Sequence, residues 1–322
     1  MTATLEVRNL RTHFLTRAGV VKAVDDVSFS VERGQVLGLV GESGSGKTVT
    51  GFSIIRLVDP PGRIAGGSIL YRGQDLATLS EREMRHLRGN RIAMIFQDPM
   101  MTLNPVLRID TQMIETVRAH TQTTHAEART RARDALGMVG IPSPEERLSA
   151  YPHQFSGGMR QRVAIAIALL HNPDLLIADE PTTALDVTIQ AQILAEVQKL
   201  AAGHGTALIW ITHDLSVIAG LADRIAVMYA GRVVEAGDAA AILDRPLHPY
   251  THGLIGSVPS RNKRGEKLRQ ITGTTPDLMS LPPGCAFRMR CAHADSTCAK
   301  EPQPIELDGR DLRCFHPMEH TA

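Results

Sequence analysis

At 322 residues, of which 43% are hydrophobic and 21% charged, the chain is long enough for one large or two ordinary domains and too apolar to be disordered. Its 35 basic and 34 acidic side chains give a formal net charge of +1, so charge alone does not attract it to nucleic acid. The longest aliphatic run, residues 163–170, is too short to cross a bilayer, and Glu6 and Arg8 interrupt the apolar core of a signal peptide, so we expect a cytoplasmic protein.

The N-terminal forty residues predict short strands. Apolar alternation favours strands at residues 5–7, 20–21 and 27–31, with glycines at the turns between them. Phe14 is the large aromatic residue of this region that could stack on an adenine. It fits equally well as a core residue of a small sheet, and both interpretations stay open.

The strongest motif lies at residues 41–48, between a strand predicted at 35–40 and a helix predicted at 49–58. Its sequence fits G-x-x-x-x-G-K-[ST], in which backbone N–H groups surround a β-phosphate and the helix N-terminus adds a positive dipole end. Lys47 would lie between the β- and γ-phosphates, and Thr48 would offer its hydroxyl to Mg²⁺. We therefore predict a nucleoside triphosphate site built from Gly41, Ser43, Gly44, Ser45, Gly46, Lys47 and Thr48.

A glutamine follows the next buried strand. Strands are predicted at 69–71 and 92–96, a short solvated helix between them, and helices from 98 to about 147. Gln97 comes directly after the second strand, at the edge where open α/β sheets bind ligands. Its neutral amide could coordinate Mg²⁺ or orient water, although a glutamine in this position is by itself an ordinary loop residue.

A second anion-binding helix end is predicted further along the chain. Ser156 is a plausible N-cap for a helix that runs to residue 170, and Gly157 and Gly158 leave its first amides uncovered. An ordinary helix start is the alternative interpretation.

Two carboxylates end a buried strand at residues 175–178. Asp179 is placed to hold a magnesium shell, and Glu180 to polarise an attacking water. Asp186 precedes an amphipathic helix and fits its N-cap. His213 follows a strand predicted at 207–211, where it could donate to a γ-phosphate or be an ordinary loop residue. A closing hairpin is predicted at 225–234.

In this order the motifs resemble those of ABC-type ATPases, the nucleotide-binding subunits of transporters, over roughly residues 4–250. In the terms of that family, Walker A is 41–48, Gln97 the Q-loop glutamine, 155–159 the signature, 175–179 Walker B, 184–186 the D-loop and His213 the switch histidine. The signature departs from the commonest form, with Phe155 and Met159 in place of leucine and glutamine. Its serine and two glycines, which make the γ-phosphate contacts in the family, are present.

The resemblance implies an α/β fold: a P-loop NTPase with a RecA-like core, an antiparallel β subdomain and a helical signature subdomain at about 98–170, within a nucleotide-binding domain at 1–245. It implies ATP and Mg²⁺ as cofactors, and two permease subunits in the membrane as partners, with no nucleic acid. Two ATPase subunits would dimerise head to tail, so that the signature serves the partner's ATP. The implied catalytic residues are Glu180, His213 and Gln97, the magnesium residues Thr48, Gln97 and Asp179, and the residues around ATP also include Phe14, Ser156, Gly157, Gly158 and Asp186.

Several stretches resemble more closely the ATPase subunits of dipeptide and oligopeptide importers. They are residues 95–99, 103–105, 151–154, 179–192 and His248-Pro249-Tyr250, which opens a C-terminal extension at 246–322 and where we expect only a turn. The resemblance implies peptide uptake, an extracytoplasmic peptide-binding protein, and a peripheral position at the cytoplasmic face of the membrane. Nickel or glutathione remains an alternative cargo. A soluble ABC protein acting on ribosomes or DNA fits less well, because the chain has one Walker A and no long heptad run.

All four cysteines lie in the C-terminal extension. Clustered thiols in a cytoplasmic chain predict a soft metal site, since disulfides are disfavoured there. The paired spacings typical of zinc sites and of ferredoxins are absent. The importer resemblance implies a [4Fe–4S] cluster, with zinc and free thiols as alternatives. The predicted ligands are Cys285, Cys291, Cys298 and Cys314.

Overall fold

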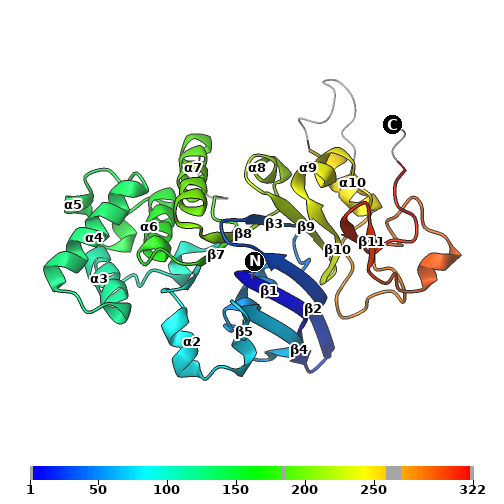
Figure 1. Ribbon diagram of the computed structural model, residues 1–322, viewed down its shortest axis with the longest axis horizontal. Coiled ribbons are helices and arrows are strands. Elements are labelled where there is room, and N and C mark those ends of the chain that lie inside the picture. The colour runs from blue at the N-terminus through cyan, green and yellow to red at the C-terminus, as the bar shows by residue number, and fades with distance from the viewer. Residues whose placement is uncertain (1–2, 183–185, 259–269, 320–322) are drawn as a thin grey trace. The chain divides into compact units, whose positions relative to one another are not determined.

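A computed structural model describes residues 3–182, 186–258 and 270–319 (Figure 1). The chain forms two compact units, one from Met1–Val31, Val36–Ala77 and Trp210–Ala322, the other from Glu32–Gln35 and Thr78–Ile209. Strand β8 (Ala207–Thr212) begins in the second unit and ends in the first. Among the described helices, none has the length and apolar character that crossing a bilayer requires.

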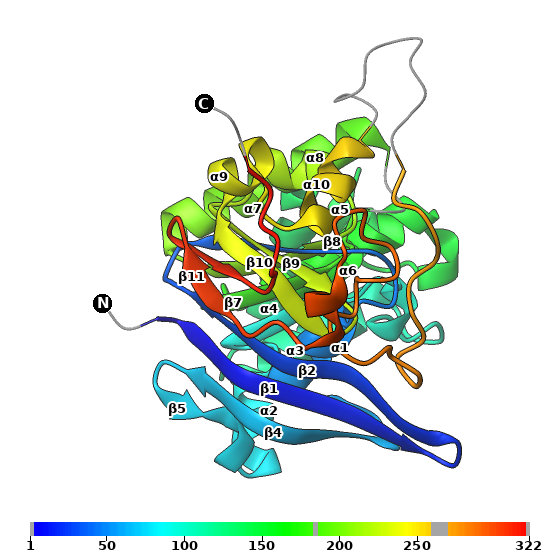
Figure 2. The same cartoon turned by 90° about the vertical axis from the view of Figure 1, so that its right-hand side faces the viewer.

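The first unit contains a four-stranded antiparallel sheet, whose blue and cyan strands lie side by side in Figure 2. Its two long strands extend well beyond the short segments that the sequence predicts, because polar residues on the exposed face hide the apolar alternation. Phe14 lies in the first of them, opposite Val21. The order is β2-β1-β4-β5, with bounds β1 Leu5–Thr16, β2 Gly19–Val31, β4 Gly62–Tyr71 and β5 Gln74–Asp75.

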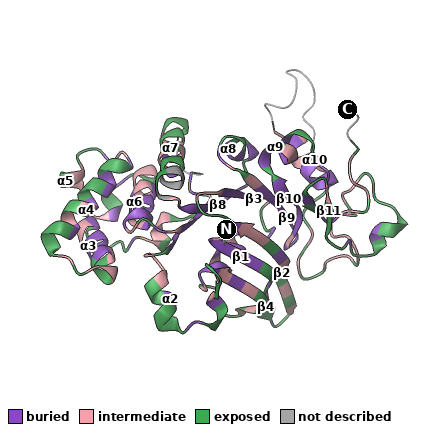
Figure 3. Cartoon of the chain, in the orientation of Figure 1, coloured by how far each residue is buried: buried purple, intermediate pink, exposed green. Residues whose placement is uncertain are grey.

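Five further strands of the first unit lie side by side, and the first of them, β3, leads into the phosphate loop. They follow the order β3-β9-β10-β12-β11, with β3 parallel to β9 and the other neighbours antiparallel. Figure 3 shows β3, β9 and β10 largely in the purple that marks buried residues. Ala230 and Gly231, with φ of 48° and 82°, form the two-residue turn of the predicted hairpin, which is confirmed. The bounds are β3 Val36–Val40, β9 Arg224–Tyr229, β10 Arg232–Asp238, β11 Ile305–Leu307 and β12 Arg310–Leu312.

The α-helices in the described part of the first unit are α1 Lys47–Ile54, α8 Leu215–Ala219, α9 Ala239–Asp244 and α10 Pro249–Gly256. Helix α10 corrects the expectation of a simple turn at His248-Pro249-Tyr250. His248 is extended, as a residue before proline prefers, and its Nδ1 accepts the N–H of Tyr250 at 3.0 Å. Pro249 occupies the first helical position, where its missing N–H costs nothing. The motif is therefore a helix start.

The second unit contains the parallel pair β6 (Ile92–Ile95) and β7 (Leu175–Asp179) and most of the helices. Capping boxes begin two of these helices, at Ser80 with Glu83 and at Thr124 with Glu127. The helices predicted after residue 98 are confirmed. The bounds are α2 Glu81–Leu87, α3 Ile109–His120, α4 His125–Met138, α5 Pro144–Arg147, α6 Gly157–Leu169 and α7 Val187–His204.

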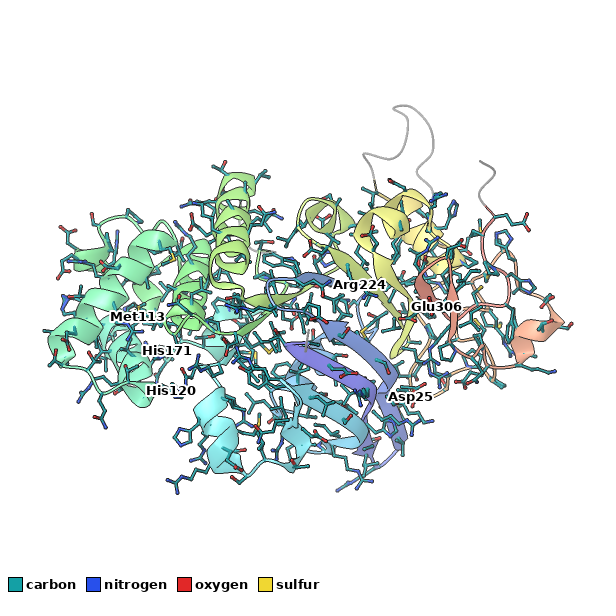
Figure 4. All side chains as sticks on the ribbon, viewed as in Figure 1. Asp25, Met113, His120, His171, Arg224 and Glu306 are labelled. Carbon is teal, nitrogen blue, oxygen red and sulfur yellow. The ribbon has the colours of Figure 1, made fainter. Side chains whose placement is uncertain are left out.

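Small and aliphatic side chains pack the helices of the second unit together. Met113 on α3 and Ala132 on α4 are fully buried. His120, at the end of α3, meets His171, just beyond α6, edge to face with ring centroids 5.2 Å apart (Figure 4). Burial lowers the pKa of both imidazoles, so this contact is between neutral rings near pH 7.

Candidate nucleotide site

The phosphate loop leaves β3 and enters α1 through a turn that depends on two glycines. A Cβ on Gly41 would lie 2.2 Å from the carbonyl oxygen of Met228, and one on Gly46 would lie 2.2 Å from that of Ala23. Both glycines also have positive φ, 153° and 101°. Only glycine fits such positions, so the backbone of β2 and β9 sets the path of the loop.

Lys47 is the first residue of α1 and is buried, with 6% of its surface exposed. Its Nζ donates to the carbonyl oxygens of Gly41 at 2.8 Å and of Glu42 at 2.9 Å. The ammonium is thus held at the centre of the loop. Together with the open N-terminus of α1 it gives the loop the positive potential that a polyphosphate requires.

Neighbouring segments hold the loop on its outer side. Gly231, in the β9–β10 turn, donates its N–H to the carbonyl oxygen of Ser45 at 3.0 Å, and Thr50 Oγ1 donates to that of Gly46 at 3.0 Å. Tyr250 OH accepts the N–H of Glu42 at 2.8 Å. The loop is therefore tied to a hairpin and to α10 as well as to its own helix.

Two other predicted residues lie in the first unit. The side chain of Phe14 is half-buried, and a Cβ on Gly62, opposite it on β4, would come within 2.6 Å of its ring. Its proposed stacking on adenine stays a prediction. His213 follows β8 directly and is exposed, as the sequence predicts for a residue beyond a strand end. Its contact with a γ-phosphate also stays a prediction.

In the second unit the structure brings Gln97 and Glu180 together. Gln97 Nε2 donates to Glu180 Oε2 at 3.4 Å, across 83 positions of sequence. Asp179, the last residue of β7, is buried with 1% of its surface exposed. Glu180 has a φ of 46°, a left-handed conformation that is uncommon outside glycine.

The helix that the signature motif opens has an uncovered N-terminus. Ser156 Oγ caps α6 by accepting the N–H of Met159 at 3.3 Å, which confirms the predicted N-cap. A Cβ on Gly157 would find no atom within 4 Å, so the first turn is open. Gly158 is half-buried, and Phe155, the departure from the commonest signature, is buried as a core residue.

Asp186 caps α7, since its Oδ1 accepts the N–H of Ile189 at 3.1 Å. The capping interpretation of this residue is confirmed. The other two D-loop positions, 184 and 185, lie outside the described residues, so a role for Asp186 at ATP stays a prediction.

All four cysteines are free thiols of the first unit. Burial raises the pKa of Cys285, Cys291 and Cys314, to about 12 for Cys314, and neighbouring thiols raise each of these values further. Backbone N–H groups point at two of the sulfurs, from His293 to Cys291 Sγ at 3.4 Å and from His316 to Cys314 Sγ at 3.3 Å. Such thiols become thiolates only beside a cation, and N–H donors suit a coordinated thiolate, so this donor set fits a soft metal centre.

Comparisons with known proteins match both parts of the chain. The family model "ABC transporter" matches residues 24–183, and the model "Oligopeptide/dipeptide transporter, C-terminal region" matches residues 234–298. The oligopeptide transport ATP-binding protein OppD of Escherichia coli (strain K12) is 48% identical over 98% of this chain and 94% of its own length. The dipeptide transport ATP-binding protein DppD of Bacillus subtilis (strain 168) is 49% identical over 98% of this chain and 95% of its own length. This chain belongs to the ABC transporter ATP-binding proteins.

The fold of this ABC protein matches solved cassettes of the same family. The dimeric structure of MJ0796, described as a bacterial ABC transporter cassette, aligns with a TM-score of 0.67 at 26% identity over 73% of this chain and 98% of the other. A post-hydrolysis structure of MJ0796 bound to ADP and Pi aligns equally well. The predicted P-loop NTPase fold is confirmed, and the chain is an ABC-type ATPase that uses ATP.

One functional candidate, Arg290, belongs to none of the sequence motifs. Arg290, in the cysteine-bearing C-terminal segment, contacts Glu42 of the phosphate loop. The two residues are 248 positions apart, and no local pattern links them.

Proposed function

We propose that this ABC ATPase powers the import of dipeptides or oligopeptides through a membrane complex. The observation that carries the proposal is near-full-length identity of 48–49% to proteins named for oligopeptide or dipeptide transport, with the C-terminal region model at 234–298 included. Sequence identity limited to the catalytic cassette would support ATP use but would not indicate which class of cargo is transported.

The complex contains two permease subunits, a second ABC ATPase arranged head to tail with this one, and an extracytoplasmic peptide-binding protein. In it this chain is peripheral, at the cytoplasmic face of the membrane. Residues 1–245 form the nucleotide-binding domain and residues 246–322 the importer-specific extension.

The residues of this chain contact two ATP molecules, its own and the one bound by the partner subunit. Lys47 and the loop amides bind the phosphates of its own ATP, Phe14 stacks on the adenine, and Glu180 accepts a proton from the attacking water. Gln97 and His213 orient the γ-phosphate and that water. Ser156, Gly157 and Gly158 present the open end of α6 to the partner's ATP, and Asp186 lies beside it.

A magnesium ion suits the donors that the motifs supply. Thr48 offers a hydroxyl, Gln97 a neutral amide oxygen and Asp179 a buried carboxylate, and oxygen donors of this kind are those that Mg²⁺ prefers. When bound, the ion would neutralise charge on the β- and γ-phosphates.

The four cysteines hold a [4Fe–4S] cluster in this proposal. Their partly buried thiols and the N–H donors at Cys291 and Cys314 support a thiolate-bound centre. Zinc is the alternative, and a specific observation favours it: ligand atoms of Asp295, Cys298 and His316 all lie within 4.8 Å of one another.

Transport in reconstituted vesicles tests the proposed cargo. The chain, its second ATPase subunit and the permease are placed in vesicles with the binding protein outside and ATP within. We expect uptake of a labelled tripeptide and stimulation of ATP hydrolysis by the peptide-loaded binding protein. Uptake of nickel or glutathione in place of peptide would reassign the cargo and leave the ATPase assignment intact.

A further inference from the structure

Arg290 links the cysteine-bearing segment to the phosphate loop. Its Nη1 lies 2.6 Å from Glu42 Oε2 and its Nη2 lies 3.0 Å from Glu42 Oε1, a two-point ion pair. The arginine side chain is only 6% exposed and the glutamate side chain 28%. A paired, largely buried guanidinium holds a carboxylate in one orientation as well as in one place.

The guanidinium is itself fixed by its surroundings. Nε donates to the carbonyl oxygen of Thr272 at 2.9 Å, and Nη1 lies 3.4 Å from Tyr229 OH. The group also lies over the rings of Tyr229 and Phe287, at 5.8 Å and 6.0 Å from their centroids. Its backbone N–H donates to the carbonyl oxygen of Phe287 at 2.9 Å, within the turn that joins Cys285 to Cys291. The position of Arg290 therefore depends on the fold of that turn.

Glu42 is held from two further directions. Its N–H donates to Tyr250 OH at 2.8 Å, and its carbonyl oxygen accepts from Lys47 Nζ at 2.9 Å. Tyr250 packs in turn on Tyr229 and Phe287, with ring centroids 4.6 Å and 5.4 Å away. One aromatic cluster, formed by Tyr229, Tyr250 and Phe287, thus supports two contacts of Glu42: the ion pair to Arg290 and the hydrogen bond to Tyr250.

We propose that Arg290 is a positioning residue for ATP, which holds the phosphate loop in its receptive shape through Glu42. The proposal rests on the nucleotide site described above and deepens it by adding control from the cysteine-bearing segment. A loop already fixed in the shape that binds phosphate loses less conformational entropy when ATP arrives. Removal of the ion pair leaves Glu42 with backbone contacts only, to Tyr250, Lys47 and Ser45, so the loop samples more shapes and binds ATP more weakly.

Linkage makes the coupling reciprocal. If an ordered C-terminal segment favours ATP binding, ATP must favour the ordered segment by the same factor. We expect ATP to slow amide hydrogen exchange in residues 285–298 of the full chain, and the Glu42→Gln variant to lose that protection.

A double-mutant cycle on ATP affinity tests the proposal in the full-length protein. We expect Arg290→Gln and Glu42→Gln each to weaken ATP binding about tenfold, and the double variant to bind no more weakly than either single variant, because each removes the same contact. Arg290→Lys should recover part of the loss, since it keeps the charge without the two-point geometry.

Arg313→Gln is the matched control. Arg313 also anchors the C-terminal segment by a buried ion pair, to Asp26 at 2.7 Å, but does not contact the phosphate loop. It should leave ATP affinity within twofold of wild type. Unchanged affinity in both Arg290→Gln and Glu42→Gln, or strictly additive losses, would overturn the proposal, as would an equal loss in Arg313→Gln.

The same experiment separates this proposal from the nucleotide assignment. Glu42→Gln removes the same ion pair by changing its more exposed member, which should disturb folding less. Its result therefore tests the proposal even if Arg290→Gln fails to fold. Wild-type protein that does not bind ATP would contradict the site itself. Tight wild-type binding with an unaffected Glu42→Gln variant would contradict only the role of Arg290.

Discussion

Lys47 shows how one side chain prepares the loop for phosphate. Its ammonium is buried and rests on two carbonyl oxygens of its own loop, those of Gly41 and Glu42. A triphosphate that enters the loop therefore meets a desolvated cation already in position.

We expect Lys47→Ala to weaken ATP binding roughly 10- to 100-fold, because a charge-assisted hydrogen bond to a phosphate is lost. Equilibrium titration with ATP measures the change. Lys199→Ala, which removes an exposed lysine of α7, is the control and should bind as wild type does. An unchanged titration for Lys47→Ala would remove this residue from the phosphate site.

Glu180 carries the predicted proton transfer. The Glu180→Gln variant keeps the shape of the side chain and an oxygen that can accept from Gln97 Nε2, but it no longer accepts a proton. We expect ATP binding to persist and the hydrolysis rate to fall about 100-fold or more. A phosphate-release assay checks the rate, with Glu196→Gln on α7 as a control of equal charge change. Undiminished release would show that another group acts as the base.

Local patterns at the residue scale predicted the loop, Asp179, Glu180 and the cap at Ser156, since each depends on neighbours within a few positions. They could not predict the left-handed backbone of Glu180, because a non-glycine residue rarely adopts positive φ and its residue type does not mark such a position. Nor could they predict the pairing of Arg290 with Glu42, because contacts between distant segments leave no periodic signal in a single sequence.

Among the elements, hairpin and helix starts were predictable where turn chemistry is strong. The β9–β10 turn and the start of α6 at Ser156 are examples. The turn predicted at His248-Pro249-Tyr250 is wrong because Pro249 keeps only the residue before it out of the helix and is itself favoured at the first helical position of α10. Strands β11 and β12 were missed because segments of three residues are too short to show alternation.

The start of α10 makes stability depend on pH. Burial lowers the pKa of His248 to about 3, so the folded chain keeps this imidazole neutral while the unfolded chain protonates it below about pH 6.5. The contribution of the neutral imidazole to the free energy of unfolding is complete above pH 6.5 and declines as the pH falls toward 3. Acidification from pH 7 to pH 5.5 should therefore lower the free energy of unfolding by about 1 kcal/mol through this residue.

His248→Asn isolates this contribution, because asparagine can still accept the N–H of Tyr250 as an N-cap but does not titrate. Urea unfolding at the two pH values measures it. The variant should lose about 1 kcal/mol less than wild type on acidification. Equal losses in both proteins would mean that other groups account for the pH dependence.

At the scale of the molecule, the resemblance of the motifs to those of ABC-type ATPases predicts the fold class, and the solved cassettes confirm it. Composition identified a folded protein but not its division into two units, which depends on packing between segments far apart in sequence. The C-terminal segment lacks enough apolar residues for a core of its own. It is held by ion pairs to β2, β10 and the phosphate loop, and by pairing of β12 with β10.

Metal analysis tests the proposed centre. Protein purified without oxygen should be brown and contain about four irons per chain, and Cys298→Ser should lose both colour and iron. Elemental analysis and visible absorption provide the measurements. Colourless wild-type protein with one zinc would instead favour the Asp295, Cys298 and His316 donors.

The distance along the chain between Glu42 and Arg290 has a consequence for biosynthesis. The ribosome synthesises Glu42 early and reaches Arg290 only 248 positions later. Over that interval the phosphate loop of the nascent chain lacks its arginine partner. A polypeptide that ends before Arg290 therefore has a phosphate loop without the ion pair to Glu42. Full affinity for ATP is then reached only after Arg290 has been synthesised and has paired with Glu42.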